Sequence, residues 1–256
     1  MPELPDLTVF AENLERLVQA KKITVVSYQG KERTILEKEL AAGLIAAQIK
    51  GVARAGKQIC FSLNNGNRLY VHLMLTGGFV VSARPAPAEF AMLTIQFDDD
   101  SQMAVTDPKG WAKVALNAGN SSAVDALEVT VDHLVALFAK KPKTLVKALL
   151  VDQNLIGGIG NAYADEILWE ARISPKSAVG RIPPEVISVL AESIPAVLEK
   201  AIACLRERHP GIISGEFREF LAVHNPSCKI SPGGSRIIKE QVGGKTTYYT
   251  DEQRLY

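Results

Sequence analysis

The first hydrophobic residues of the chain recur at the spacing of an amphipathic α-helix, in which residues three and four positions apart share a face. Asp6 stands just before them and is of a residue type that caps helices. The pattern therefore predicts a helix at the start of the chain. Its apolar face is formed by Leu7, Phe10, Leu14, Leu17 and Val18.

From Lys22 to about Asn117 the pattern changes to short apolar runs of the kind that form strands. The sequence Asn-Asn-Gly-Asn at 64–67 is a strong signal for a hairpin turn. Several short strands joined by such turns predict a β-sandwich or a flattened barrel. The predicted strands include Ile23–Tyr28, Gln58–Leu63, Leu69–Leu75 and Leu93–Phe97.

The hydrophobic period becomes helical from about Val131 and stays so to Arg208. Within this stretch Lys143–Gln153 and Ala162–Ala171 are predicted helices, and Pro183-Pro184 begins the last long one. A chain of 256 residues, 47% of them hydrophobic, can form one large or two small cores. We therefore expect an α+β multidomain protein.

The last stretch of the chain is rich in glycine and strand-forming residues, which predicts a small terminal hairpin. The expected organisation has three parts. They are an N-terminal β-sandwich domain with its leading helix at 1–120, a helical domain at 130–224, and a finger-like hairpin at 225–256.

Composition places the chain in the cytosol. Charged residues interrupt the first apolar stretch as no signal peptide would allow, and no apolar run is long enough to cross a bilayer. The chain has three cysteines, Cys60, Cys204 and Cys228, far apart and odd in number. This usage indicates a reducing compartment rather than disulfides.

The formal net charge of +1 argues mildly against a DNA-binding role. The charges are unevenly distributed, however, because four lysines fall in a window without acids between His133 and Val151. Such a cluster is either a solvated helix face or a contact strip for phosphates. The four are Lys140, Lys141, Lys143 and Lys147.

The opening Met1-Pro2-Glu3-Leu4-Pro5 carries candidate chemistry. If Met1 is removed, the nitrogen of Pro2 becomes a secondary amine, and a terminal amine with a pKa near ~8 is partly neutral at physiological pH. Glu3 places a carboxylate beside it. Such a pair suits nucleophilic attack on a sugar or carbonyl carbon. The structural alternative is that this segment is only a rigid start to a helix.

A second motif, Asn154 to Asn161, lies between two predicted helices and contains Gly157, Gly158 and Gly160. Glycines let the backbone approach a partner closely, and we expect Asn161 to cap the following helix. Backbone N–H groups at a helix start bind anions such as phosphate. Close packing of the two helices is the alternative reason for these glycines.

One family joins these motifs, and the chain resembles it nearly end to end. It is similar to the bacterial formamidopyrimidine-DNA glycosylase/endonuclease VIII family. The resemblance implies a β-sandwich, a helix–two-turn–helix domain and a finger hairpin, with damaged double-stranded DNA as partner. The matching segments are Pro2–Pro5, Gly56-Lys57, His72-Leu73, Thr76-Gly77, Thr106–Pro108, Lys143-Thr144, Ile159–Asn161, Tyr163-Ala164 and the terminal hairpin.

The resemblance also implies a mechanism. The amine of Pro2 would attack C1′ of a damaged nucleoside and displace the base, and the Schiff base would then allow β- and δ-elimination. Glu3 would act as acid and base at the sugar, and Lys57 would contact the phosphate or base at the lesion. The residues expected to contact DNA are Asn161, Lys143, Gly158, Gly160, Lys245, Leu75, Trp111 and Lys109.

The chain departs from the family where an everted base leaves a void. The family commonly has Met, Arg and Phe there, whereas the matching positions here are Leu75, Gly110 and Trp111. Leu and Trp can wedge between bases, but Gly110 cannot hydrogen-bond the orphaned base. We therefore expect opposite-base recognition to be weak or different. A simple packing role for Leu75 and Trp111 stays open.

The finger departs most. Zinc-bearing members have Cys-x-x-Cys twice, but only one of the four thiols is present here, so no zinc and no other cofactor is expected. We expect a zincless finger held by side-chain packing. The stretch from Ile212 to His224 is also short for a loop that covers 8-oxoguanine. The candidate packing residues are Ile230, Ile237, Val242, Tyr248 and Tyr249.

The expected protein is a monomeric, cytosolic, bifunctional DNA glycosylase and abasic-site lyase of base-excision repair. Its substrates would be oxidised or ring-opened bases. The alternative is a lesion-binding or abasic-site-binding protein on the same fold with weak catalysis. The altered wedge and finger favour this alternative, whereas Pro2, Glu3 and Lys57 argue against it because binding alone needs no terminal amine.

Overall fold

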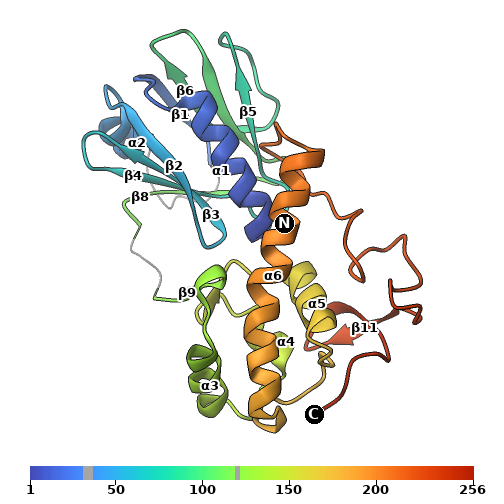
Figure 1. Cartoon of the computed structure of the whole chain (residues 1–256). Helices are drawn as coiled ribbons and strands as arrows, with labels where there is room; N and C mark the ends of the chain where they lie inside the picture. The colour runs from blue at the N-terminus through green and yellow to red at the C-terminus, as the bar shows by residue number, and fades with distance from the viewer. Residues whose placement is uncertain (31–36, 119–121) are drawn as a thin grey trace. The chain divides into compact units, whose positions relative to one another are not determined.

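The computed structural model describes residues 1–30, 37–118 and 122–256 (Figure 1). The chain divides into two compact units. The first consists of Met1–Asn120 with Leu205–Glu216, and the second of Ser121–Cys204 with Phe217–Tyr256. None of the helices among the described residues is both long enough and apolar enough to cross a membrane.

The first unit is a sandwich of two antiparallel sheets preceded by helix α1 (Leu4–Val18). One sheet has the order β1-β6-β7-β5 and the other β2-β3-β4-β8. A short helix, α2 (Glu37–Leu44), follows β1. The strands are β1 (Ile23–Tyr28), β2 (Ile49–Ala55), β3 (Gln58–Leu63), β4 (Arg68–His72), β5 (Gly78–Ser82), β6 (Ala91–Phe97), β7 (Gln102–Thr106) and β8 (Lys113–Leu116).

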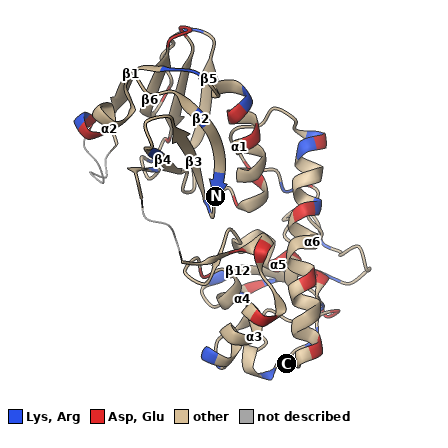
Figure 2. Ribbon diagram, turned by 60° about the vertical axis from the view of Figure 1, so that its left-hand side comes forward, with Lys and Arg blue, Asp and Glu red and all other residues tan. Residues whose placement is uncertain are grey.

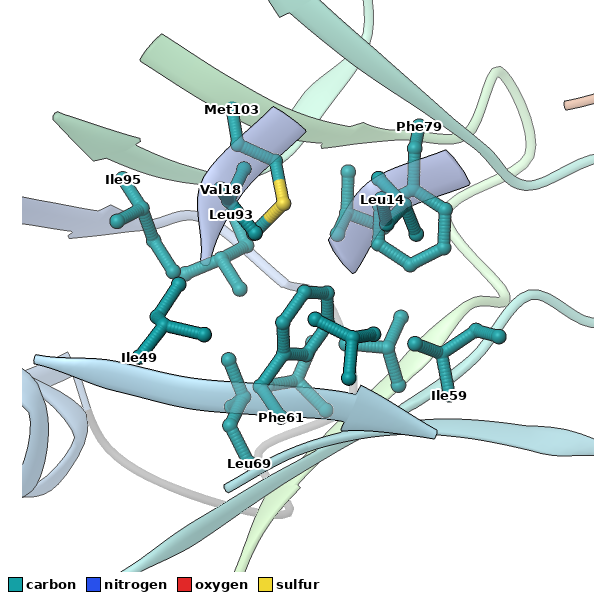
Figure 3. Packing of buried hydrophobic residues seen from close by; sticks show 14 of the residues in the cluster. Leu14, Val18, Ile49, Ile59, Phe61, Leu69, Phe79, Leu93, Ile95 and Met103 are labelled. Atoms are coloured by element: carbon teal, nitrogen blue, oxygen red, sulfur yellow. The ribbon is translucent and has the colours of Figure 1, made fainter. Parts of the chain in front are cut away.

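The core of this unit lies between the sheets, and α1 contributes Leu14 and Val18 to it (Figure 3). Successive side chains of a strand point to opposite faces of a sheet, so every second residue of β3 reaches this core: Ile59, Phe61 and Leu63. The rings of Phe61 on β3 and Phe79 on β5 meet edge to face, with their centroids 6.0 Å apart. This contact joins the two sheets at a fully buried point.

The second unit contains α3 (Val131–Lys140), α4 (Val146–Leu150), α5 (Asn161–Glu170) and most of α6 (Pro184–Arg208). Figure 2 shows acidic and basic residues interspersed along α6, in keeping with the near-neutral total charge. The shorter elements are β9 (Val124–Asp125), η1 (Ala126–Glu128), β10 (Ile156–Gly157), η2 (Val179–Arg181), β11 (Ile238–Val242) and β12 (Lys245–Tyr249).

Strands β11 and β12 pair antiparallel as a terminal hairpin, with Val242 opposite Lys245. The hairpin lies beside α5 (Figure 1). The predicted fold class is confirmed: a β-sandwich, a helical region and a C-terminal hairpin are all present. The predicted bounds of β1 and β3 are also those observed.

Four elements differ from their predicted bounds. Strand β6 begins at Ala91 instead of Leu93, and α5 runs over Asn161–Glu170 instead of Ala162–Ala171. Strand β4 ends at His72 instead of Leu75, because the chain turns there, with Met74 at φ 52° and the Gly77 amide donating to the Leu73 carbonyl. Helix α4 is shorter than the predicted Lys143–Gln153. Thr144 lies in a turn before the helix, and Asp152 lies in a turn after it.

Candidate functional site

The start of the chain is folded onto the first unit, and Pro2 is buried. Glu3, rather than the predicted Asp6, is the cap of α1. Asp6 lies in the first turn of the helix and accepts a hydrogen bond from the Glu3 amide at 2.8 Å. The Glu3 side chain accepts the Asp6 amide in return, which fixes the Glu3 carboxylate at the helix start.

The terminal amine of Met1 pairs with the carboxylate of Glu216. With Met1 in place, the nitrogen of Pro2 belongs to a peptide bond, so its reactivity depends on the removal of Met1. Pro2 lines a pocket of about 500 Å³ within the first unit. The other lining residues come from three segments: Leu75–Gly78, Thr106 with Pro108, and Ser214–Glu216.

Lys57 lies in the turn between β2 and β3, where Gly56 has a φ of 57°. The Arg54 guanidinium donates to the Gly56 carbonyl at 3.2 Å and to the Thr8 hydroxyl on α1 at 3.1 Å. Arg54 thus fastens the lysine-bearing turn to the helix that begins beside Pro2. The turn and the start of the chain are brought together in this way.

The Lys57 side chain is buried, and its charge acts on His72 at the end of β4. Burial first, and then the nearby Lys57 and Lys113, lower the pKa of His72 below its ordinary value. Its Nδ1 accepts a hydrogen bond from the Met74 amide at 3.0 Å. A neutral His72 is compatible with a positive Lys57 nearby.

Leu75 and Trp111, the predicted wedge residues, project from two loops that share one carboxylate. Asp107 accepts hydrogen bonds from the Thr76 hydroxyl at 2.5 Å and from the Trp111 amide at 2.7 Å. It also accepts from the amides of Lys109 and Ala112. Burial alone would raise the pKa of Asp107, but these donors lower it, so the carboxylate stays charged.

Both wedge candidates are exposed, Leu75 by 56% and Trp111 by 43%. This exposure favours the wedge role over the packing role that was left open for them. The ammonium of Lys109 lies 5.1 Å from the centre of the Trp111 ring, close enough for a cation–π contact. Asp107 orders the Trp111 loop and links it to the turn that carries Leu75.

In the second unit, the glycine-rich turn precedes α5 as predicted, but Gly160 and not Asn161 is the cap. The Asn161 side-chain amide donates to the Thr246 carbonyl of β12 at 2.7 Å. Its carbonyl oxygen is buried and lacks a hydrogen-bond partner among the described residues. Gly158, at φ 106°, donates to the Gln153 side chain at 3.1 Å, which holds the turn in place.

Lys147 does not belong to the lysine strip. It is 1% exposed, and its ammonium forms an ion pair with Asp165 at 2.7 Å and donates to the Thr247 hydroxyl at 2.6 Å. Asp165 also accepts the Tyr248 amide and pairs with Nδ1 of His224. Lys147 therefore joins α4, α5 and β12. The exposed lysines of the strip are Lys140, Lys141 and Lys143.

The hairpin carries Lys245, which is exposed at the start of β12. Of the residues predicted to pack it, Ile230 is 60% exposed, so that prediction is wrong. Tyr248 and Ile237 do pack, against Trp169 of α5 and Val223. Val242 is also buried, and Tyr249 lies under the ammonium of Lys176.

The four positions that match the zinc ligands of the family hold Cys228, Ser231, Thr250 and Gln253. Two hydroxyls, an amide and an exposed thiol are not a donor set for tetrahedral Zn²⁺. The described part of the chain contains no cluster of three or more His, Cys, Asp or Glu residues suited to a metal.

Sequence reasoning missed several buried polar residues that organise these sites. Glu166 accepts the amides of Ala222, Val223 and His224 and so fixes the segment before the hairpin. Burial raises the pKa of Glu166 despite these donors. The one sequence signal for such residues is an acid inside an otherwise apolar segment. Asp165 is the second buried acid of this kind. The half-buried Arg54 and Glu252, which organise their surroundings in the same way, were missed as well.

Two family models match the chain. Residues 1–114 match the formamidopyrimidine-DNA glycosylase N-terminal domain, and residues 123–208 match the formamidopyrimidine-DNA glycosylase H2TH domain. A formamidopyrimidine-DNA glycosylase of Pelotomaculum thermopropionicum is 31% identical over 271 residues, covering 97% of each chain. One from Protochlamydia amoebophila is 32% identical over 212 residues, covering 79% of this chain and 77% of the relative.

The fold has close counterparts among solved structures. A complex of Lactococcus lactis Fpg with DNA containing an abasic site has a TM-score of 0.87 and 25% identity, and it covers 99% of this chain and 100% of that one. A structure of MutM with DNA containing carbocyclic 8-oxo-G has a TM-score of 0.85 at the same identity and coverage.

Proposed function

The chain belongs to the formamidopyrimidine-DNA glycosylase family, and we propose that the nitrogen of Pro2 carries out its chemistry. The protein is a DNA glycosylase of base-excision repair with abasic-site lyase activity. Its partner is DNA. The observation that supports the assignment to Pro2 is its place on a pocket of about 500 Å³, next in the chain to Glu3, whose carboxylate is fixed at the start of α1.

The reaction begins once Met1 has been removed. The Pro2 nitrogen attacks C1′ of the damaged nucleoside, the bond from C1′ to the base breaks, and the base leaves with a proton. The Pro2 nitrogen then loses its proton, and the C1′–O4′ bond breaks as O4′ takes up a proton, which opens the sugar ring and leaves an iminium. The iminium withdraws electrons, so a base can remove the C2′ proton. The bonds to the 3′ and then the 5′ phosphate break in two eliminations. Glu3 is the proposed proton donor and acceptor at the sugar, and Lys57 is the proposed contact to a phosphate or base at the lesion.

Chemistry at C1′ requires the nucleotide to leave the stack, which is least costly at a damaged base. The pocket beside Pro2 is the candidate receptor for the everted base, and Ser214–Glu216 form part of its wall. Leu75 and Trp111, held by Asp107 and aided by Lys109, are candidates to fill the gap in the duplex. Oxidised pyrimidines and ring-opened purines are the proposed substrates.

The second unit supplies the proposed grip on the DNA backbone. The N-terminus of α5, after the Gly158–Asn161 turn that Gln153 holds in place, is the proposed contact for a phosphate. Lys143 and Lys245 are exposed and add positive charge without the bidentate geometry of arginine. We expect a protein that acts as a monomer in the bacterial cytosol and needs neither zinc nor another cofactor.

The test is covalent trapping. The purified protein, verified by mass spectrometry to begin at Pro2, is incubated with an abasic-site duplex and borohydride, and a denaturing gel is read for an adduct. The control is the same chain with an uncleaved extension before Pro2. We expect an adduct only with the unblocked protein. An equally strong adduct from the blocked protein would show that the nucleophile is a group other than the Pro2 nitrogen.

The trapping experiment also distinguishes the proposed glycosylase and lyase from the alternative, a lesion-binding protein with weak catalysis. A lesion-binding protein with weak catalysis would bind the duplex and give no adduct even when the protein begins at Pro2. A panel of duplexes that each carry one lesion then identifies the preferred base. Light scattering of the protein–DNA complex tests whether the protein acts as a monomer.

A further inference from the structure

The base of the hairpin is organised around one carboxylate, that of Glu252. Its Oε2 accepts hydrogen bonds from the Ser231 hydroxyl at 3.0 Å, the Thr250 hydroxyl at 3.0 Å and the Trp169 indole at 2.8 Å. The Arg172 guanidinium lies 3.2 Å from the same oxygen. The partners come from both arms of the hairpin region and from the end of α5.

Two of these partners stand where zinc-bearing relatives have cysteine. Ser231 and Thr250 occupy the second and third ligand positions, and Gln253, at the fourth, is also engaged. Its side-chain oxygen accepts the Thr250 amide at 2.9 Å, and its side-chain nitrogen donates to the Ile173 carbonyl at 2.9 Å. The residues that replace the thiols therefore form a connected hydrogen-bond network.

We infer that Glu252 is a positioning residue that fastens the hairpin in place of a metal ion. A bound metal would join two distant stretches of chain by ligating both. Here the carboxylate joins them by accepting from residues 231 and 250, and it adds a third tie to Trp169. Hydrogen bonds to an ionised group are roughly twice as strong as neutral ones, so one carboxylate can replace several weaker contacts.

Glycine at position 233 is consistent with this role. A Cβ on Gly233 would overlap Oε1 of Glu252, so the carboxylate is seated against the bare backbone of this turn. Gly233 is not in the left-handed region, and its lack of a side chain is required by the neighbouring carboxylate alone. Replacement of Gly233 is therefore a way to displace the carboxylate without removing its charge.

The network around Glu252 should affect the proposed DNA contacts of the second unit. It consists of the bonds from Ser231, Thr250, Trp169 and Arg172. It lies at the base of the hairpin whose strand β12 carries Lys245, and the Thr246 carbonyl of that strand holds the Asn161 amide. Loosening the base changes the placement of both proposed phosphate contacts. In this respect the inference rests on the proposed function.

The test compares four variants of the full chain with the wild type. Glu252→Ala removes the carboxylate, Glu252→Gln keeps its size, and Gly233→Ala displaces it. Asp251→Asn is the matched control, because Asp251 is the exposed neighbour and loses the same charge. Hydrogen exchange is followed by mass spectrometry over residues 237–250, with residues 58–72 as an internal reference. Affinity is measured for a duplex with a tetrahydrofuran abasic analogue.

We expect exchange at 237–250 to accelerate about tenfold in Glu252→Ala, and less in Glu252→Gln and Gly233→Ala, as follows from the loss of hydrogen bonds to a charged group. Affinity for the duplex should fall by a similar factor. Exchange at 58–72 should not change, and Asp251→Asn should resemble the wild type. Bound metal should be absent by elemental analysis, and a chelator should change nothing.

The inference would be overturned if hydrogen exchange at 237–250 were no faster in Glu252→Ala than in Asp251→Asn. Stoichiometric zinc whose removal by a chelator accelerates exchange at 237–250 would also overturn it. Hydrogen exchange involves no reaction at Pro2, so its outcome is independent of the trapping experiment. If trapping failed and the exchange pattern held, the catalytic proposal alone would fall.

Discussion

The sandwich and the hairpin are held together by different kinds of interaction. The sandwich has a continuous apolar core shared by two sheets and α1, whereas the hairpin adds one small cluster around Trp169, Val223 and Tyr248. A two-stranded hairpin buries too little surface to be stable by itself. The hairpin here is tied to its helices by buried or half-buried charges on Lys147, Asp165 and Glu252. A small element can thus be fixed by a few directional contacts where a core is not available.

The largest effect is expected in the sandwich. Phe61→Ala removes a ring that is buried between the sheets and should lower the free energy of unfolding by about 3–5 kcal/mol. Urea denaturation measures this loss. Ile238→Ala, on the exposed strand β11, is the control and should cost far less. Similar losses in the two variants would mean that the apolar core does not dominate stability.

A comparable effect is expected from the buried ion pair of the second unit. Lys147→Met leaves the buried carboxylate of Asp165 without its ammonium partner and should lower the free energy of unfolding by about 3–5 kcal/mol. The double variant Lys147→Met with Asp165→Leu should recover part of this loss, because no uncompensated charge remains. Urea denaturation of the single and double variants decides the matter. A double variant less stable than Lys147→Met would show that the contacts of Asp165 with Tyr248 and His224 matter more than its uncompensated charge.

Asp107→Ala should have a smaller effect on stability, about 1–3 kcal/mol, because it leaves the amides of Trp111 and Ala112 without their acceptor. Its effect on activity should be larger than its effect on stability, since both wedge loops depend on it. Single-turnover excision and urea denaturation are compared in the same variant. If excision were normal and stability reduced, the role of Asp107 would be structural and not functional.

Acid should loosen the hairpin before the sandwich. The Trp169 indole first, and then Ser231, Thr250 and Arg172, hold the pKa of Glu252 below its ordinary value of 4.5 despite partial burial. The stabilisation is therefore complete above the unfolded pKa of 4.5 and is lost as pH falls through the lower folded value.

Trp169 fluorescence in a Trp111→Phe background reports this transition, because Trp111 is the other tryptophan of the chain. Glu252→Gln should show no transition in the same window. A transition of equal size in that variant would assign the acid sensitivity to another group.

The smallest expected effect is at the tip of the hairpin. Lys245→Ala removes one exposed charge and should weaken duplex binding alike for damaged and undamaged DNA. It should also reduce the salt slope by about 0.9. Titrations at several salt concentrations measure this slope. A loss confined to one lesion would mean that Lys245 reads the damage instead of the backbone.

Much of the fold follows from local pattern. Strands β1 and β3 have their predicted bounds because alternation and turn signals are properties of adjacent residues. The overall architecture and Pro2, Glu3 and Lys57 as candidates followed from motifs and from family resemblance. The turn after His72 was missed because a positive φ at Met74 has no local signal.

The contacts that organise the sites could not be predicted, since they join residues far apart in the sequence. Thr76 and Asp107 are 31 positions apart, and Trp169 and Glu252 are 83 apart. Asn161 was predicted to cap α5 because asparagine often does so, but its amide is taken by Thr246 across the unit. Lys147 was grouped with exposed lysines because a charge cluster does not reveal which member has a buried partner.

The hydroxyl and carboxylate groups at the base of the hairpin have a chemical consequence for a repair enzyme. Cysteines bound to a metal are thiolates, which peroxides convert to sulfenic and higher acids. Ser231, Thr250 and Glu252 offer oxidants no such sulfur. The proposed fastening of the hairpin therefore contains no thiolate that the oxidants of DNA bases could attack.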